Sequence, residues 1–492
     1  MSTMLYLNGN IYTMDVDQPR AQAIAIDSAS GRILAVGTND EVRSVSRAHG
    51  ELVDLHGKTV LPGFIDAHIH LLDTAHRAYY IDAGTCTSED EVAALVRQRA
   101  AQIPLGKWVL GGHWDKNLWP DERFPSKASL DAVAPTHPVA LWSKDGHLLW
   151  VNSLALQRAG ITAATPQPPT GAILCDGTGE PTGVLQEEGA TSLVYSVIDR
   201  SDPQMNRVLL QSTLLELQRY GITTIHDIEG ETSLHLFQEL RDEGALGVRV
   251  NMILPRSMLP QLRTQSINND DNDLLRIGGI KIFADGTLGS QTAAMLESFE
   301  GNPSNYGILT IAEQGTSTVP SSRYRLEHVQ LIAPEDLQRM RRLGVIASVQ
   351  PFHAVADRDI AERYWGKRHR RAYAYRTMHD LGIPLALGSD APVELFDPLR
   401  ILYAATQRRD PTIARPPWLP DQALSIADAL WGYTLGAAYA GAEEQHKGSL
   451  TPGKLGDAVV LREDILNVPQ DAMPENGVQA TILGGNVVYG EI

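Results

Sequence analysis

Two histidines separated by one residue, His68 and His70, lie in the apolar segment Phe64–His70, which predicts a β-strand. Side chains at positions i and i+2 of a strand point to the same face, so the two imidazoles should project together. Two imidazoles on one face at a strand end are a natural half of a metal site. The alternative is a pair of hydrogen-bonded histidines. The later segment Pro384–Val393, which contains Asp390, favours the metal.

Strands must position these residues, and seven segments are predicted to be strands that alternate with helical patterns. This alternation predicts an α/β fold of the TIM (β/α)8-barrel type, in which functional side chains gather at the C-terminal ends of the strands. A doubly wound sheet is the alternative fold, but no glycine-rich phosphate loop follows the first strand. The segments are 64–70, 221–228, 248–254, 279–285, 324–330, 345–351 and 384–390, and they end near His68, His70, His226, Lys281, Asp285, His328 and Asp390.

An eighth strand is missing from this pattern. It would lie between Asp285 and Tyr324, where the segment Gly315–Pro320 is too short and polar to form a βα unit. We therefore expect a barrel that lacks one βα unit. The strands on either side of the missing unit, 279–285 and 324–330, would then either pair directly or leave a gap that exposes apolar surface.

Short β-like runs at both ends of the chain predict a small β-sandwich built from residues 1–56 and 445–492, because neither end could bury a core alone. Residues 57–444 would form the barrel, with an inserted subdomain at about 71–220. The insert holds five of the eight tryptophans, and their rings suit either a pocket for an apolar or aromatic substrate or the core of the insert. These tryptophans are Trp108, Trp114, Trp119, Trp142 and Trp150.

The composition excludes several classes of partner. With 42 Lys and Arg against 59 Asp and Glu, the net charge of −17 disfavours nucleic acid and anionic membranes. Two cysteines support neither a disulfide framework nor a cysteine-type zinc site. No signal peptide or membrane-spanning run is evident. We expect a cytoplasmic protein that acts on a small molecule, and the sequence leaves open whether it forms a homodimer.

Several motifs, taken in order along the chain, resemble the amidohydrolase superfamily, and specifically its YtcJ-like group, amidohydrolase family 3. Each motif alone is weak, but their combination in this order is highly specific and covers nearly all of the chain. The matching segments are Leu61–His70, Gly111–Asp115, Asp145–Ser153, Lys281–Ser290, Arg325–Gln330, Gly388–Pro392 and Pro452–Asp457.

The resemblance implies metal-binding roles. His68, His70 and Asp390 would bind a first divalent metal, zinc by the chemistry of the ligands. Lys281, carboxylated by CO₂, would bridge to a second metal on His328. Without the metal, Lys281 would form an ordinary ion pair and His328 would be a hydrogen-bonded core histidine. Similar sequences supply a further histidine from strand five, whereas this chain has no histidine from 236 to 327.

The resemblance also implies substrate contacts. His113, Asp115 and His147 in the insert motifs are candidates, with structural hydrogen bonding as the alternative for each. Asp285 and His226 are further candidates at the rim, with weaker claims.

The implied reaction is hydrolysis of a non-peptide, amide-like C–N bond by metal-activated water, with Asp390 carrying the proton. Lactone or ester hydrolysis on the same scaffold is one alternative. Because the strand-five segment is missing, the chain could instead be a deletion product of an active hydrolase, a hydrolase that works with one metal ion rather than two, or a catalytically impaired binding or regulatory protein.

Overall fold

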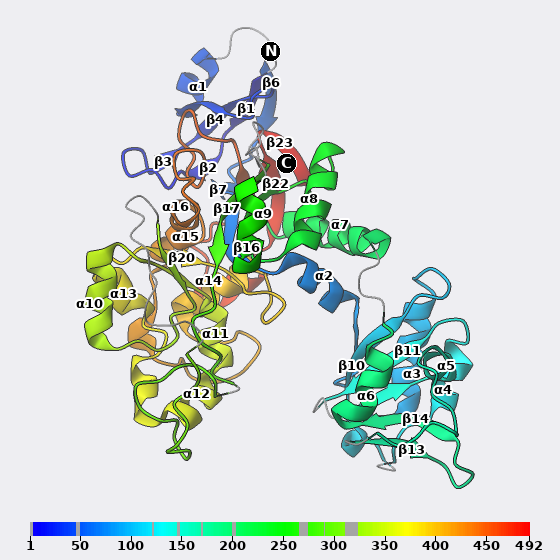
Figure 1. Cartoon of the computed structure of the whole chain (residues 1–492). Coiled ribbons are helices and arrows are strands. Elements are labelled where there is room, and N and C mark those ends of the chain that lie inside the picture. The colour runs from blue at the N-terminus through cyan, green and yellow to red at the C-terminus, as the bar shows by residue number, and fades with distance from the viewer. Residues whose placement is uncertain are drawn as a thin grey trace. The chain divides into compact units, whose positions relative to one another are not determined.

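The computed structural model describes residues 3–45, 50–120, 123–144, 148–168, 171–198, 203–264, 274–289, 291–309 and 323–492. The chain forms two compact units (Figure 1). The first unit comprises Met1–Asp73 and Leu210–Ile492, and the second comprises Thr74–Leu209. The chain passes between the units within helices α2 (Leu71–Tyr79) and α7 (Pro203–Arg219).

Seven parallel strands of the first unit overlap the seven predicted segments. Hydrogen bonds join β17, β16, β15 and β8 in one sheet and β18, β19 and β20 in another. Most of these strands are buried along their whole length, as expected for parallel strands with both faces covered. Their bounds are β8 (Phe64–Ile69), β15 (Ile222–Asp227), β16 (Arg249–Pro255), β17 (Leu275–Lys281), β18 (Arg325–Glu327), β19 (Ile346–Val349) and β20 (Leu385–Leu387).

The ends of β20 and β8 lie side by side, so the two sheets continue into one another. The Asp390 amide donates to the His68 carbonyl at 2.7 Å, and the His70 amide donates to the Ala391 carbonyl at 2.9 Å. The spatial order is therefore β17-β16-β15-β8-β20-β19-β18. Among the described residues, β17 and β18 do not pair, and 282–289 and 291–309 add no strand to either sheet. The described strands thus form no closed barrel, and 310–322 lie outside the described residues.

The outer strands β17 and β18 are less buried than the strands between them. Apolar side chains just beyond the end of β17 are exposed, with Phe283 at 64% and Ile282 at 52%. Leu326 on β18 and the neighbouring Tyr324 are also exposed. These exposed side chains border the interval in which the sequence predicts a gap, and because 310–322 lie outside the described residues, the gap stays a prediction.

Strands from both ends of the chain share one sheet. The C-terminal β21 pairs with β7, which pairs in turn with the N-terminal β2. A core of buried side chains joins this sheet to a second one, with Ile24 and Ile26 packed near Val460 and Ile482. The sheets have the orders β23-β22-β21-β7-β2-β3 and β5-β4-β1-β6. These two sheets and the parallel strands lie in one compact unit. The limits predicted for the β-sandwich and for the barrel therefore stay predictions.

The bounds of these strands are β1 (Thr3–Leu7), β2 (Asn10–Tyr12), β3 (Arg20–Ala21), β4 (Ala23–Asp27), β5 (Ile33–Gly37), β6 (Gly50–Asp54), β7 (Thr59–Pro62), β21 (Ala458–Leu461), β22 (Val478–Leu483) and β23 (Asn486–Gly490).

Helices of the first unit begin and end where the sequence supplies caps. Asp397 accepts hydrogen bonds from two amides in the first turn of α14, and Gly344 ends α10 with a positive φ of 65°. The helices are α1 (Asn39–Val45), α8 (Glu231–Asp242), α9 (Leu259–Thr264), α10 (Pro334–Leu343), α11 (Pro351–Ala356), α12 (Arg358–Trp365), α13 (Tyr375–Asp380), α14 (Pro398–Gln407), α15 (Ile426–Gly432) and α16 (Leu435–Ala440). None of the described helices is long and apolar enough to cross a membrane.

The second unit is built on one six-stranded sheet of order β13-β14-β12-β11-β10-β9. Trp114, Trp119 and Trp150 meet in its core with ring centroids 5.9–6.3 Å apart, so these three rings have a structural role. Its elements are β9 (Ile81–Asp82), β10 (Val109–Trp114), β11 (Val139–Ser143), β12 (Leu148–Val151), β13 (Ala172–Cys175), β14 (Pro181–Gln186), α3 (Glu89–Ala100), α4 (Lys127–Val133), α5 (Ser153–Arg158) and α6 (Glu187–Tyr195).

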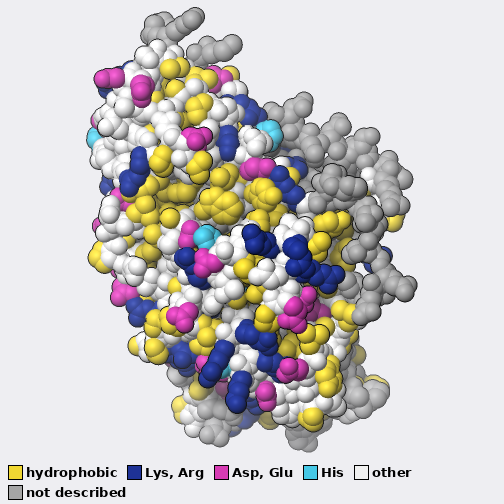
Figure 2. All heavy atoms as spheres, turned by 90° about the vertical axis from the view of Figure 1, so that its left-hand side faces the viewer, with side chains coloured by type: hydrophobic (Ala, Val, Ile, Leu, Met, Phe, Trp, Pro, Cys, Tyr) yellow, Lys and Arg dark blue, Asp and Glu magenta, His cyan; other side chains and the backbone are white. Residues whose placement is uncertain are grey.

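The surface carries both signs of charge in spite of the negative net charge. On the face drawn in Figure 2, basic and acidic side chains lie intermixed, and hydrophobic side chains gather in one area.

Candidate metal centre

Four imidazoles surround the carboxylate of Asp390, which follows β20. Its Oδ1 lies 3.4 Å from His68 Nε2 and 3.3 Å from His70 Nε2. Its Oδ2 lies 3.4 Å from His353 Nε2 and 3.8 Å from His328 Nδ1. The structure therefore brings together four of the five predicted metal ligands and adds His353.

Asp66 fixes the position of this cluster from inside β8. Its Oδ1 accepts hydrogen bonds from the amides of His68, at 3.1 Å, and Ser389, at 2.9 Å. Burial raises the pKa of Asp66 to about 6. Because His68 and Ser389 belong to different segments, this one carboxyl group ties the end of β8 to the loop that carries Asp390.

Hydrogen bonds orient the two rings of the first pair. The Nδ1 of His68 lies 2.7 Å from Glu327 Oε2, and the Nδ1 of His70 lies 2.7 Å from the carbonyl oxygen of Ile228. A carbonyl oxygen can only accept, so the Nδ1 of His70 carries the hydrogen, and we assign His68 likewise. In both rings Nε2 is left to face Asp390, which is the usual way in which a ligating histidine is held.

The first set, His68, His70 and Asp390, has the spacing of a metal site. Ligands at about 2.0–2.1 Å from a tetrahedral ion are about 3.3–3.4 Å from one another. The Nε2 atoms of His68 and His70 lie at this distance from Asp390 Oδ1. Three protein ligands leave a fourth position for water or substrate, as in catalytic zinc sites. The residues present therefore fit a divalent ion.

The second set consists of His328, His353 and Asp390. His353 is 5% exposed, and neither of its ring nitrogens has a hydrogen-bond partner in the part of the chain that the structure describes. The Nδ1 of His328 forms a hydrogen bond with Gln350 Oε1 at 2.8 Å. A second ion would fit here, but its ligands are less well oriented than those of the first set.

Sequence reasoning missed His353 because it lies on helix α11, beyond the strand β19. The available signal was its position four residues past the strand end, on the side of the barrel where the other ligands lie.

Burial and charge keep His68, His353 and Asp390 in metal-binding protonation states. Burial would lower the pKa of His70, but the neighbouring Asp390 carboxylate raises it above its usual value, so a metal ion must compete with a proton there. Burial lowers the pKa values of His68 and His353 to about 4, so both rings are neutral at pH 7. Burial alone would raise the pKa of Asp390, but the contact with His70 and the other nearby imidazoles lower it to about 2. Neutral imidazoles and an ionised carboxylate are the forms that bind metal.

Lys281 ends β17 and belongs to neither candidate set. Burial lowers the pKa of its amine, although the negative charges of Glu327 and Asp390 act in the opposite direction. Its Nζ lies 5.2 Å from the centre of the Phe283 ring. A lowered pKa makes the neutral amine more accessible.

Two predicted rim residues lie elsewhere. The strand expected over 279–285 ends at Lys281, so Asp285 is in the following loop, where its Oδ2 accepts from the Ala294 amide at 3.0 Å. His226 is buried on β15 with its Nδ1 2.9 Å from Arg325 Nη1. Neither residue is part of the candidate sets.

The predicted substrate contacts of the insert lie in the second unit. His113 is bound on both nitrogens, with Nδ1 3.1 Å from Asp82 Oδ1 and Nε2 3.1 Å from Arg77 Nη2. Asp115 is half-buried, and His147 lies outside the described residues. Their roles in substrate binding stay predictions.

A model of the amidohydrolase family matches residues 51–322 and 308–489. The chain belongs to the amidohydrolase family. The two matched segments meet at 308–322, within the interval in which the sequence shows no eighth strand. Membership supports a metal-dependent hydrolase of C–N bonds and a divalent metal as its cofactor.

Relatives of this amidohydrolase match it almost end to end. It is 29% identical to N-substituted formamide deformylase of Arthrobacter pascens, over 99% of this chain and 98% of that protein. It is 26% identical to the putative amidohydrolase YtcJ of Bacillus subtilis, over 99% of both. These alignments run to 539 and 528 positions, whereas the chain has 492 residues, so both relatives contain segments that this amidohydrolase lacks.

A solved structure supports the TIM-barrel-type fold. An uncharacterised metal-dependent hydrolase from Pyrococcus furiosus superposes with a TM-score of 0.78 at 24% identity, over 94% of this chain and all of that chain.

Proposed function

We propose that this amidohydrolase cleaves non-peptide, amide-like C–N bonds with one tightly held divalent ion, zinc by preference. The observation that carries the proposal is the first set, in which the Nε2 atoms of His68 and His70 both lie at tetrahedral spacing from Asp390 Oδ1 and each imidazole is held by an Nδ1 hydrogen bond. Two imidazoles, a carboxylate and an open position are typical of catalytic zinc.

The residues around the ion divide the work of hydrolysis. The bound ion would activate water and polarise the substrate carbonyl. Asp390 would take the proton of the attacking water on Oδ2, since Oδ1 would be the metal-binding oxygen beside His68 and His70. As the C–N bond breaks, the same oxygen would return that proton to the leaving nitrogen, giving a carboxylic acid and an amine.

The proposed substrates are small N-acyl or N-formyl amines. The name of the Arthrobacter pascens relative describes removal of a formyl group from an N-substituted formamide, which is such a C–N cleavage. The match over 98% of that protein includes the insert, which is expected to decide specificity.

Lys281 is proposed to carry a carbamate. Its amine, once neutral, would attack CO₂, forming an N–C bond and releasing one proton. Burial favours this step because it lowers the pKa of the amine. Carbon-13 NMR of protein equilibrated with labelled bicarbonate should show a carbamate resonance that is missing in Lys281→Gln. The absence of this resonance from the wild-type spectrum would contradict the proposed carbamate on Lys281.

Release of 4-nitroaniline from 4-nitroformanilide and 4-nitroacetanilide tests the function. The zinc-loaded protein should hydrolyse at least one of them, and Asp390→Asn should lose the activity. Asp421→Asn, which changes an exposed aspartate of the same unit, is the matched control and should retain it. Equal rates for wild type and Asp390→Asn would contradict the proposal. Activity confined to 4-nitrophenyl acetate would show an esterase instead.

A further inference from the structure

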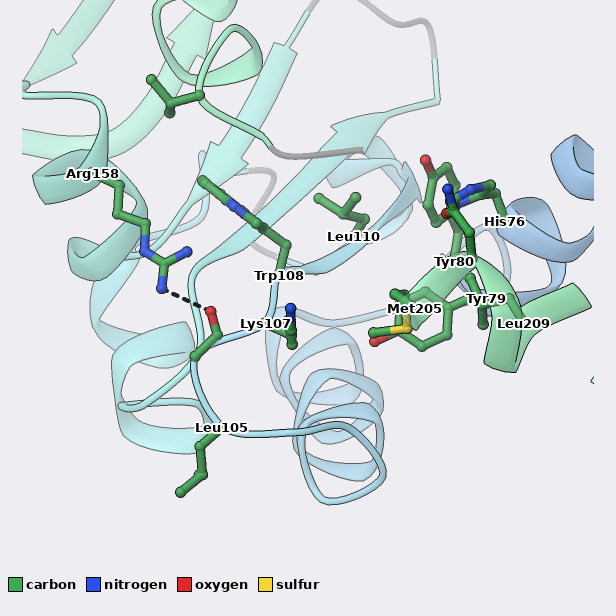
Figure 3. Close-up of a pocket in the computed structure, with 13 residues that line it drawn as sticks. His76, Tyr79, Tyr80, Leu105, Lys107, Trp108, Leu110, Arg158, Met205 and Leu209 are labelled. Carbon is green, nitrogen blue, oxygen red and sulfur yellow. Dashed lines mark hydrogen bonds between the residues drawn. The ribbon is translucent and has the colours of Figure 1, made fainter. Parts of the chain in front are cut away.

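The second unit contains a cavity of about 380 Å³ that no part of the proposed reaction uses (Figure 3). All of its lining residues lie between His76 and Leu209, so the second unit forms it by itself. Its volume falls within the range of small-molecule sites in proteins.

The walls suit a flat apolar ligand. Three aromatic side chains, Tyr79, Tyr80 and Trp108, line the cavity together with Leu110 and Met205. Figure 3 shows Tyr79, Tyr80 and Met205 grouped on one side and Trp108 with Leu110 on the other. Aromatic walls favour a ring, because stacked and edge-on ring contacts add to the burial of apolar area.

The charge of the lining is positive. Two positively charged side chains, Lys107 and Arg158, line the cavity together with His76, and none of the described residues that line it is acidic. Arg158 Nη2 donates to the Gly106 carbonyl at 2.7 Å, which holds the guanidinium 5.7 Å from the centre of the Trp108 ring. In a chain with a net charge of −17, such a lining favours an anion, and guanidinium matches a carboxylate in shape.

Two of the lining side chains have a buried polar atom without a hydrogen-bond partner among the described residues. Asn206 is 2% exposed and its Oδ1 has no hydrogen-bond partner within the described part of the chain. The same holds for the buried hydroxyl of Tyr79. An amide oxygen only accepts, so a ligand that satisfies Asn206 must offer an N–H or O–H group.

We propose that this cavity is a second small-molecule site, distinct from the metal centre, for an aromatic carboxylic acid with a hydrogen-bond donor on or near its ring. The ring lies between Trp108 and the two tyrosines. The carboxylate pairs with Arg158, and the donor reaches Asn206 once that buried side chain turns toward the cavity.

Calorimetric titration of the full-length protein with 4-hydroxybenzoate tests the site, since this probe has a ring, a carboxylate and one donor. We expect saturable 1:1 binding that Arg158→Gln weakens by about tenfold or more, because a charge-assisted hydrogen bond is lost. Arg97→Gln removes an exposed arginine of helix α3 in the same unit and should leave the affinity unchanged. No saturable heat, or equal loss in both variants, would overturn the proposal.

Two further titrations test the role of Asn206 and the place where the probe binds. Benzoate, which lacks the donor, should bind more weakly than 4-hydroxybenzoate, and Asn206→Leu should abolish this difference while keeping the affinity for benzoate. A difference that persists in Asn206→Leu would contradict the proposed role of Asn206. Binding should be unchanged in His68→Ala, whereas its loss there would place the probe at the metal centre.

Discussion

Replacing Glu327 by alanine should weaken metal binding although Glu327 is in neither candidate set. Its Oε2 lies 2.7 Å from the Nδ1 of His68, a ring that is 1% exposed. Arg325 holds the carboxylate in turn, with Nε 3.0 Å from Oε1. Burial would raise the pKa of Glu327, but Arg325 and His68 hold it well below its usual range, so it is an ionised acceptor at pH 7.

The expected loss of metal affinity follows from the role of the Glu327 carboxylate in orienting His68. Loss of the group that orients a ligating histidine costs about 10–100-fold in metal affinity, which is about 1.4–2.8 kcal/mol. Water cannot readily replace the acceptor, because His68 is buried. Glu327→Gln keeps an oxygen that can accept the same hydrogen bond and should lose less.

Competition with a chelating zinc indicator measures this effect. Glu335→Ala, which removes an exposed glutamate from the first turn of α10, is the matched control. Circular dichroism establishes that the variants are equally folded. Equal zinc affinities for Glu327→Ala and Glu335→Ala would refute the assigned role of Glu327.

Two further predictions concern stability and the second set. Asp457→Asn removes the carboxylate charge that pairs with the buried Arg249, whose Nε lies 2.6 Å from Asp457 Oδ2, and we expect denaturant titration at pH 7 to show a loss of about 3–5 kcal/mol. Burial raises the pKa of Asp457 but Arg249 holds it below its usual value, so this stability is present above about pH 4 and is lost as the pH falls through the folded pKa. The difference between wild type and variant should therefore shrink at pH 3, and a constant difference would contradict the assignment. His353→Ala should keep the tightly held ion and lose only a weaker second one in a zinc titration, whereas loss of the tight ion would show that the second set is the primary site.

The positions of the seven parallel strands could be predicted because each has a local pattern of apolar residues. The end of β17 was misplaced by four residues, since apolar residues continue past Lys281 and only pairing with β16 decides where the strand stops. His68, His70 and Asp390 were predicted because they end such strands.

Other parts of the site depend on contacts between distant residues. The bond between His68 and Glu327 joins residues 259 positions apart, and no pattern near either one indicates it. His353 reaches Asp390 from a helix, so the rule of strand ends does not find it. The lack of pairing between β17 and β18 among the described residues was predictable only as a missing segment, and the exposure of Ile282 and Phe283 became evident from the fold.

Elemental analysis of the purified protein, after exhaustive dialysis against metal-free buffer, tests the proposed one-metal centre most directly. We predict one equivalent of divalent metal per chain in the wild type and none in His68→Ala. An undiminished metal content in His68→Ala, or two equally tightly held equivalents in the wild type, would contradict it.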